Sequence, residues 1–344
     1  MEDDDQAGAD DNDIGLVEEL SWLAGGFGFD DSDDVVIESH FDRKYSELDT
    51  EQVMARIRSS EVDYCERTKL VELQMGTMAL CRGDRGEELC RAGAIHALLY
   101  TLTELLNKVP APQEPTSIHL ETESIVRLAV ACFGAIRDLA CGSAGTREAL
   151  RTIPFDGMGG MQLLSEYLRK YHGIYWHEID SLHLKLLTCA IGAMRNVTHS
   201  TTENCTLLHH YGVSHMLIWR LKHGSGGDED ETIALPVSSD PWREGVFRSA
   251  STLINMAEKC SESAEVCATD PLVIRLLVES WGGSQRTCPL LHLGLAAVLR
   301  CAKQQLPPHL FNEEWDFILV NERQRKADAQ KREEERKGLA ASSD

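Results

Sequence analysis

One short apolar pattern recurs along the chain at nearly equal steps. It reads GTMALCR from Gly76, GAIRDLA from Gly134, GAMRNVT from Gly192, STLINMA from Ser251 and GLAAVLR from Gly294. Successive copies begin 58, 58, 59 and 43 residues apart. Regular spacing of one motif is typical of a chain built from similar units, each of which buries its apolar face against its neighbours. Stacked repeats are therefore the first expectation.

The segments between the copies predict helices. Each copy is followed by a short polar turn, a short helix, a Gly or Pro break and a second apolar stretch, which gives three helices per unit. Asp270 before Pro271, for example, is a good N-cap with proline at the first helical position. Aromatic residues make up only 6% of the chain, which suits closely packed helices better than sheets. The predicted fold class is all-α.

The helix that carries the second copy is apolar over a broad face. Its main stripe consists of Ile125, Leu128, Cys132, Ile136 and Leu139. A second stripe beside it consists of Val126, Val130 and Phe133. An apolar face this wide predicts a helix in contact with neighbours on two sides.

The spacing also predicts where the repeat domain begins and ends. We expect it over residues 51–304. Because steps of 58 and 59 exceed the roughly 40 to 47 residues typical of such repeats, the units must contain extra residues. Three insertions, rich in Pro, Gly or polar residues, are expected near 107–120, 171–182 and 224–241. Residues 305–344 should form a charged C-terminal helix and a short tail.

Most of the negative charge lies at the N-terminus. The chain has a formal net charge of −22, and residues 1–50 contain 17 acidic but only two basic residues. This composition predicts a mostly disordered acidic tail. An apolar segment within it, from Ile14 to Phe29, is expected either to fold on a partner or to cap the repeat domain. An acidic chain repels phosphate, so nucleic acid is disfavoured as the main ligand, although a local basic patch is compatible with the composition.

The sequence offers few signs of catalysis, metal binding or membrane insertion. It contains no HExxH motif, no phosphate-binding loop, no GxSxG and no paired Cys or His spacing for zinc. We therefore expect no catalytic residues, no metal and no cofactor. No apolar stretch reaches the roughly 18 to 20 residues of a membrane span. Eleven cysteines without a CxxC pair favour a reducing compartment, the cytoplasm or the nucleus.

In its repeated motif the chain resembles the armadillo family, within the wider group of ARM- and HEAT-like repeats. The family pattern of alanine, leucine, any residue, asparagine and leucine corresponds to AIRDL from Ala135, AMRNV from Ala193 and TLINM from Thr252. The resemblance covers about residues 60 to 303 and identifies no subfamily. It implies a right-handed superhelical solenoid of about four to five three-helix repeats.

The resemblance also implies a binding surface. In the family, the third helices line a concave groove, and the asparagine position faces it. The corresponding residues here are Asp138, Asn196 and Asn255, and Arg137 and Arg195 precede two of them. Such side chains can hydrogen-bond to the main chain of an extended peptide. The alternative is that they only satisfy backbone groups between neighbouring repeats.

These observations predict a non-enzymatic scaffold or adaptor that binds a peptide or helix of one or more proteins in its groove. Nuclear-import adaptors of the superfamily place tryptophan one turn before the asparagine, where this chain has Gly134, Gly192 and Ser251. The difference argues against a receptor for basic nuclear-localisation peptides. The alternative function is that of a component of a ribonucleoprotein or nuclear-transport assembly, acting through its basic C-terminal helix.

Overall fold

A computed structural model gives the structure of the protein. It describes residues 48–72, 84–110, 120–152, 154–155, 158–199, 201–223, 242–282, 289–311, 313, 315–321, 323–324, 327–328 and 330–331. The chain divides into two units, Met1–Leu48 and Asp49–Asp344, and nearly all described residues belong to the second. Four predictions therefore lie outside the described residues: the N-terminal tail, the first motif copy, the third insertion and most of the first insertion.

The described part of the second unit is helical. Its α-helices are α3 (Thr50–Arg58), α4 (Tyr64–Val71), α6 (Asp84–Arg91), α7 (Ala94–Leu106), α8 (Leu120–Gly142), α9 (Ala144–Thr152), α10 (Gly160–Arg169), α11 (Ser181–Thr198), α12 (Thr202–His210), α13 (Val213–His223), α14 (Arg243–Lys259), α15 (Ser261–Ala268), α16 (Pro271–Gly282) and α17 (Pro289–Gln305). Short 3-10 turns lie at Trp176–Glu178 and Pro308–Leu310, and the residues described between 313 and 331 are helical. Two-residue strands, β1 (Pro154–Phe155) and β2 (Met158–Gly159), pair antiparallel. The all-α prediction is confirmed.

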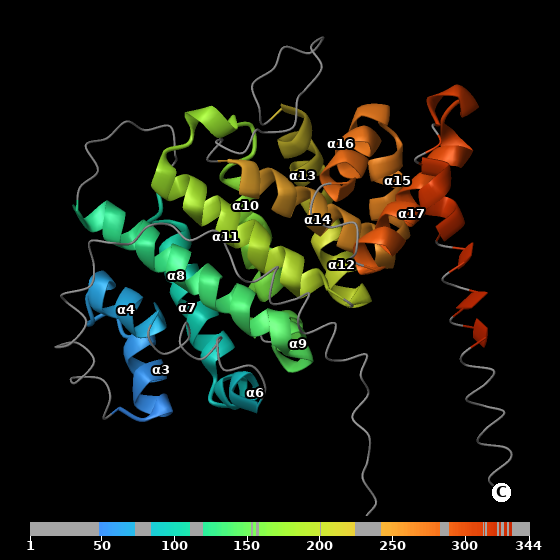
Figure 1. Ribbon diagram of the computed structural model, residues 1–344. Helices are drawn as coiled ribbons and strands as arrows, with labels where there is room; N and C mark the ends of the chain where they lie inside the picture. Colours follow the sequence, from blue (N-terminus) through green and yellow to red (C-terminus); the bar gives the residue numbers. More distant parts are fainter. Residues whose placement is uncertain are drawn as a thin grey trace, which may run out of the picture. The chain divides into compact units, whose positions relative to one another are not determined.

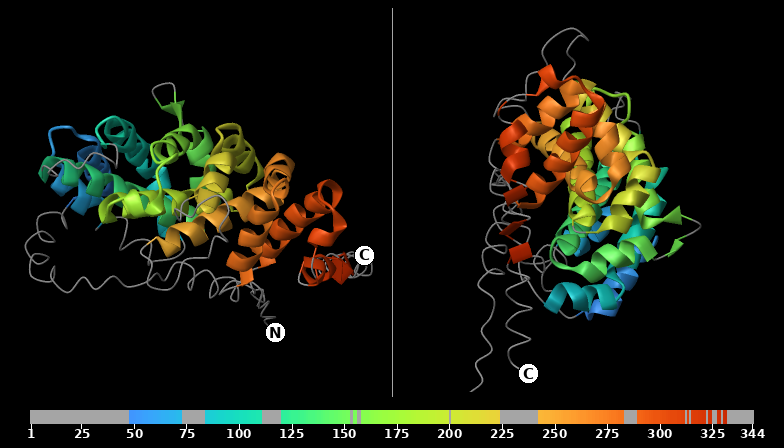
Figure 2. Two further views of the ribbon diagram at one scale, coloured as in Figure 1. Left: turned by 90° about the horizontal axis from the view of Figure 1, so that it is seen from above. Right: turned by 90° about the vertical axis from the view of Figure 1, so that its right-hand side faces the viewer.

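The four described copies of the motif lie in the long helices α8, α11, α14 and α17. Each of these helices packs along the next one in the series (Figure 1). The shorter helices α3, α7, α10, α13 and α16 form a second series of neighbours, and α4 packs against α8. In the view from above, the helices follow one another in chain order (Figure 2).

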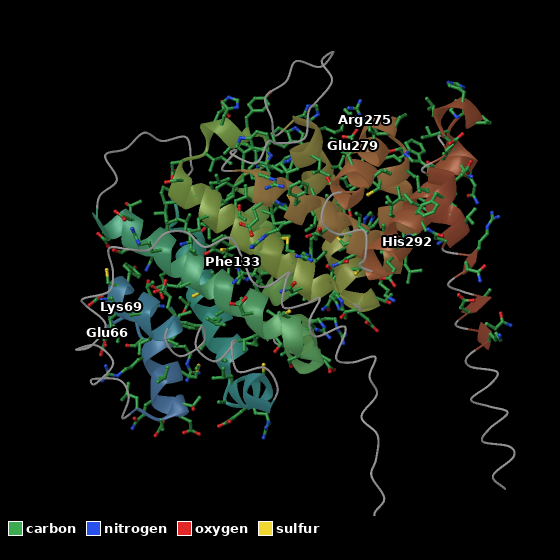
Figure 3. The ribbon with its side chains drawn as sticks, in the orientation of Figure 1. Glu66, Lys69, Phe133, Arg275, Glu279 and His292 are labelled. Atoms are coloured by element: carbon green, nitrogen blue, oxygen red, sulfur yellow. The ribbon has the colours of Figure 1, made fainter. Side chains whose placement is uncertain are left out.

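Burial of the predicted apolar stripe holds α8 in place. Leu128, Cys132 and Ile136 are fully buried, which confirms the prediction. Phe133, labelled on α8 in Figure 3, meets the ring of Tyr167 edge-on at 4.8 Å between centroids. Because aromatic pairs favour this geometry, the contact adds to the stabilisation from burial alone.

The second insertion is part of the core. Tyr171 and Trp176, at its start and middle, are each only 1% exposed. The buried guanidinium group of Arg220, on α13, donates hydrogen bonds to the backbone carbonyls of Tyr171 and Ile174. It also lies 4.7 Å from the centroid of the Trp176 ring. The buried side chain of Arg220 thus binds the predicted extra residues to α13.

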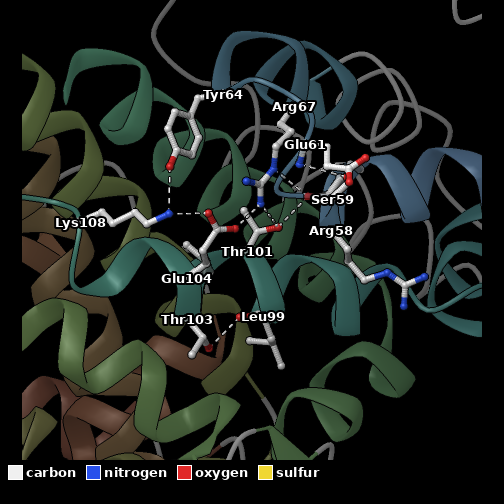
Figure 4. Close-up of polar contacts among 12 residues, drawn as sticks. Arg58, Ser59, Glu61, Tyr64, Arg67, Leu99, Thr101, Thr103, Glu104 and Lys108 are labelled. Carbon is white, nitrogen blue, oxygen red and sulfur yellow. Dashed lines mark hydrogen bonds and ion pairs between the residues drawn. The ribbon is translucent and has the colours of Figure 1, made fainter. Parts of the chain in front are cut away.

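A second buried arginine joins α3, α4 and α7. Arg67 is fully buried, donates to the carbonyl of Ile57 at 2.8 Å and contacts Glu104 at 2.9 Å (Figure 4). Glu104 also accepts a hydrogen bond from Lys108 at 2.8 Å, and Lys108 donates to the hydroxyl of Tyr64 at 3.0 Å. Burial alone would raise the pKa of Glu104, but together these two cations outweigh it and hold that pKa below its ordinary value.

We expect Glu104→Gln to lower the free energy of unfolding by about 2 to 4 kcal/mol at pH 7, because it leaves a buried cation without its carboxylate. A depressed carboxyl pKa stabilises the fold above the unfolded-state value of about 4.3. The difference between wild type and variant should therefore shrink as the pH falls below about 4. Urea unfolding followed by circular dichroism measures it. Glu123→Gln, in the exposed pair with Arg127, is the matched control; an equal loss there would contradict the role of burial.

Two glycines at equivalent motif positions should respond oppositely to alanine. A Cβ atom on Gly294 would collide with the backbone carbonyl of Ile254, on α14, whereas one on Gly134 would meet nothing within 4 Å. Gly294→Ala should therefore force α17 away from α14 and cost at least about 2 kcal/mol. Gly134→Ala should stabilise its helix by about 0.5 to 1 kcal/mol. Melting temperatures that shift in the same direction would show that the close approach at Gly294 is unimportant.

Candidate partner-binding surface

The five residues predicted to bind a partner lie on three neighbouring helices. Arg137 and Asp138 belong to α8, Arg195 and Asn196 to α11, and Asn255 to α14. Hydrogen bonds between the helices and contacts around Gly192 bring these residues together with Arg248, which the sequence did not single out. Lys185, a second such residue, is exposed on α11 about two turns before Gly192. We call the resulting surface the polar face; it consists of Arg137, Asp138, Lys185, Arg195, Asn196, Arg248 and Asn255.

The two asparagines bind the backbone of the preceding long helix. The Nδ2 atom of Asn196 donates to the carbonyl of Arg137 at 2.8 Å, and that of Asn255 donates to the carbonyl of Arg195 at 3.1 Å. The two bonds are equivalent: each joins the asparagine of one motif copy to the backbone carbonyl of the fourth residue of the preceding copy, on the preceding long helix. The amide donors thus satisfy backbone groups between helices, which was one of the two alternatives. Val298, at the next equivalent position, is buried.

A third inter-helix asparagine was missed from the sequence. The amide of the buried Asn204, on α12, donates to the carbonyls of Arg147 and Val197, both at 3.0 Å. Its position after the motif, rather than inside it, gave no signal of this role. Hydrogen bonds from an asparagine amide to backbone carbonyls therefore also join α12 to α9 and to α11.

Two arginine side chains meet over Gly192, on α11. A Cβ atom at Gly192 would collide with the guanidinium group of Arg248 and lie 3.3 Å from Cδ of Arg137. Arg248 reaches across from α14 and donates to the carbonyl of Thr188 at 3.1 Å. The glycine thus leaves room for two cations at the place where import adaptors have tryptophan. The sequence gave no signal that Arg248 would join this site.

Each of these arginines has a carboxylate beside it. Arg137 binds both oxygens of Asp138, from Nε at 2.6 Å and from Nη2 at 3.1 Å. Burial disfavours the charge of Arg137, but together the neighbouring acidic groups, Asp138 above all, outweigh it and raise its pKa. Arg248 forms an ion pair with Glu244. The side chain of Arg137 remains 29% exposed, so it is open to a ligand as well.

A second group of cations lies at the end of α11. Burial lowers the pKa of His199, and the positive charges of Arg147, Arg195 and Lys259 lower it further. These cations come from α9, α11 and α14. His199 is consequently neutral near pH 7. The contribution of the three cations to its lowered pKa indicates a positive electrostatic potential around the ring.

Along these helices basic side chains outnumber acidic ones. The basic residues are Arg137, Arg147, Lys185, Arg195, Arg248 and Lys259; the acidic residues beside them in the described part of the chain are Asp138, Glu148, Glu244 and Glu258. The chain as a whole is strongly acidic, so this surface differs in sign from the average of the molecule.

Two further sets of reactive groups are largely buried. Ser214 and Ser263 are both fully buried, lie 3.1 Å apart and share hydrogen bonds with Nδ1 of His209 at 3.0 and 3.1 Å. The three groups join α12, α13 and α15. Burial also raises the pKa of Cys132 and Cys205 to about 12, so their thiols are protonated. Both arrangements are those of packed structural groups.

Two further properties concern only the described residues. Among them, no three His, Cys, Asp or Glu side chains gather in a way that could hold a metal ion. None of the helices formed by these residues is both long and apolar enough to cross a membrane.

Comparisons with known proteins add no relative. No family model, curated protein or solved structure matches the chain.

The asparagine bonds should contribute measurably to stability. Asn255 is only 6% exposed, so Asn255→Ala would remove a buried hydrogen bond between α14 and α11, while the Arg195 carbonyl would keep the Thr198 hydroxyl as a donor at 2.8 Å. We expect a loss of about 0.5 to 1.5 kcal/mol in the free energy of unfolding. Asn107→Ala, at an exposed position after α7, should change it by less than about 0.5 kcal/mol. Urea unfolding measures the stability of both variants. A negligible effect of Asn255→Ala would show that these hydrogen bonds do not stabilise the fold.

Proposed function

We propose that this protein is a non-enzymatic scaffold that holds a segment of a partner protein on its polar face. In this proposal the helices form an armadillo-type right-handed solenoid of three-helix units in the cytoplasm or nucleus. The order of the helices supports it: α6 to α8, α9 to α11, α12 to α14 and α15 to α17 each consist of two shorter helices and a long one. The long helices pack on one another in series.

One observation carries the binding proposal. The long helices are locked together through backbone carbonyls and the amides of Asn196 and Asn255, yet charged side chains beside those bonds stay partly exposed. Arg137 and Asp138 are 29% and 26% exposed. Lys185, about three turns before Asn196 on α11, is exposed as well. A rigid support with polar groups at fixed positions suits recognition, because little conformational entropy is lost when a ligand binds.

The buried nucleophilic groups are better suited to packing than to catalysis. A thiol attacks as the thiolate, and burial raises the pKa of Cys132, Cys205 and Cys267 to about 12. The serines beside His209 are also fully buried. These groups are therefore better explained as parts of the packing.

Site-specific photo-crosslinking tests the proposal in cells. A benzoylphenylalanine at position 185 would probe the polar face, and one at position 275 would probe α16. Arg275 is a suitable control because it is exposed and forms only a surface pair with Glu279 (Figure 3), which is worth little stability. We expect adducts at position 185 that map to one contiguous segment of a partner. An excess of the synthetic segment should compete with them.

Adducts that form equally from both positions, or from position 275 alone, would contradict the proposal. Circular dichroism should show that both variants fold like the wild type.

A further inference from the structure

We infer that the polar face recognises an acidic, extended segment of a partner protein, with carboxylates at every third residue. The inference rests on the proposed function and adds the chemistry of the partner. Charge complementarity, the spacing of the cations along α11 and an acceptor atom at the centre of the face support it.

The cations occur at three levels along α11. Lys185 marks the first level, the Arg137 and Arg248 pair over Gly192 the second, and the cations around His199 the third. These levels are separated by seven residues each. At a rise of about 1.5 Å per residue, seven residues of helix span about 10.5 Å.

An extended peptide matches this spacing. Three residues of extended or polyproline II chain span about 9 to 10 Å, and in polyproline II every third side chain returns to the same side. Acidic residues at every third position would therefore meet successive cation levels. Acidic residues in one unbroken run would place most of their charge on only one level.

The guanidinium groups can take a second carboxylate. A guanidinium has five N–H donors, and Arg137 uses only Nε and Nη2 to bind Asp138. Asp138 and Glu244 keep the two arginines in place, so a ligand meets cations that are already oriented. Arginine is the side chain best suited to bind carboxylates in this way.

An acceptor on the face favours an extended segment over a helix. The Oδ1 atom of Asn196 forms no hydrogen bond with any described residue, while its Nδ2 atom is fixed on the Arg137 carbonyl. It can accept a main-chain N–H from the ligand. An extended segment offers free N–H groups, whereas those inside a helix are already bonded.

Peptide binding to the full chain tests the inference. The probes are fluorescent 13-residue peptides with Glu at every third position, with the same residues but contiguous Glu, and with Gln in place of Glu. We expect the spaced peptide to bind at least about fivefold more tightly than the contiguous one, and the Gln peptide not to bind. Affinity should fall as salt rises from 50 to 200 mM, since exposed charges are screened.

A matched pair of charge reversals locates the site. Lys185→Glu should weaken binding of the spaced peptide by about tenfold or more, because attraction becomes repulsion. Arg91→Glu, at an exposed position on α6, should leave it unchanged. His199 provides a second readout, because carboxylates bound beside it should raise its pKa in an NMR titration of the labelled chain. We expect the pKa of His199 to rise on peptide binding in both the wild type and the Arg91→Glu variant.

Three outcomes would overturn the inference. They are equal binding of the spaced and contiguous peptides, tighter binding of a 12-residue single-stranded RNA than of the spaced peptide, and a photo-adduct from position 185 to residues 1–47 of the same chain. The last would mean that the acidic N-terminal segment occupies the face. Partner adducts at position 185 without acidic-peptide binding would leave the proposed function standing and refute only this chemistry.

Discussion

The close packing of the long helices is the constraint on which the rest of the structure depends. At Gly294 the backbone of α14 approaches α17 so closely that a Cβ atom would collide with a carbonyl. The amides of Asn196 and Asn255 bridge the neighbouring long helices. These contacts fix the helices in register, and the register decides which side chains meet. The polar face is a consequence of this packing, because its residues come from three helices far apart in sequence.

Periodicity predicted the helices well because it reports which positions are buried. The stripe through Leu128, Cys132 and Ile136 is buried as expected, and the expected cap at Asp270 accepts a hydrogen bond from the N–H of Leu272 at 2.9 Å. Spacing cannot show where a polar side chain points, however. The alternatives for Asn196 and Asn255 could be separated only by the positions of the neighbouring carbonyls.

The buried arginines show a second limit of sequence reasoning. Arg67 and Arg220 look like ordinary surface residues in the sequence, because a charged side chain is seldom fully buried. Their burial becomes favourable only through partners distant in the chain: Glu104 for Arg67, and the carbonyls of Tyr171 and Ile174 for Arg220. Arg248 joined the polar face for the same reason, since it reaches α11 from α14 through the space left by Gly192. Such pairings follow from the fold and have no local pattern.

Net charge was a poor guide to the charge of the polar face, because it averages over regions of different composition. Screening limits the reach of an exposed charge to about 8 Å at physiological salt, so a ligand on α11 senses mainly the side chains beside it. Taken together, the described cations around Gly192 and His199 outnumber their described acidic neighbours, although Asp138 and Glu244 match the two arginines at Gly192 one to one. The ion pairs with Asp138 and Glu244 do not cancel this effect, since each holds a guanidinium group at a fixed place and direction. A surface that is locally basic and rigid can therefore select an acidic ligand within a molecule of the same sign as that ligand.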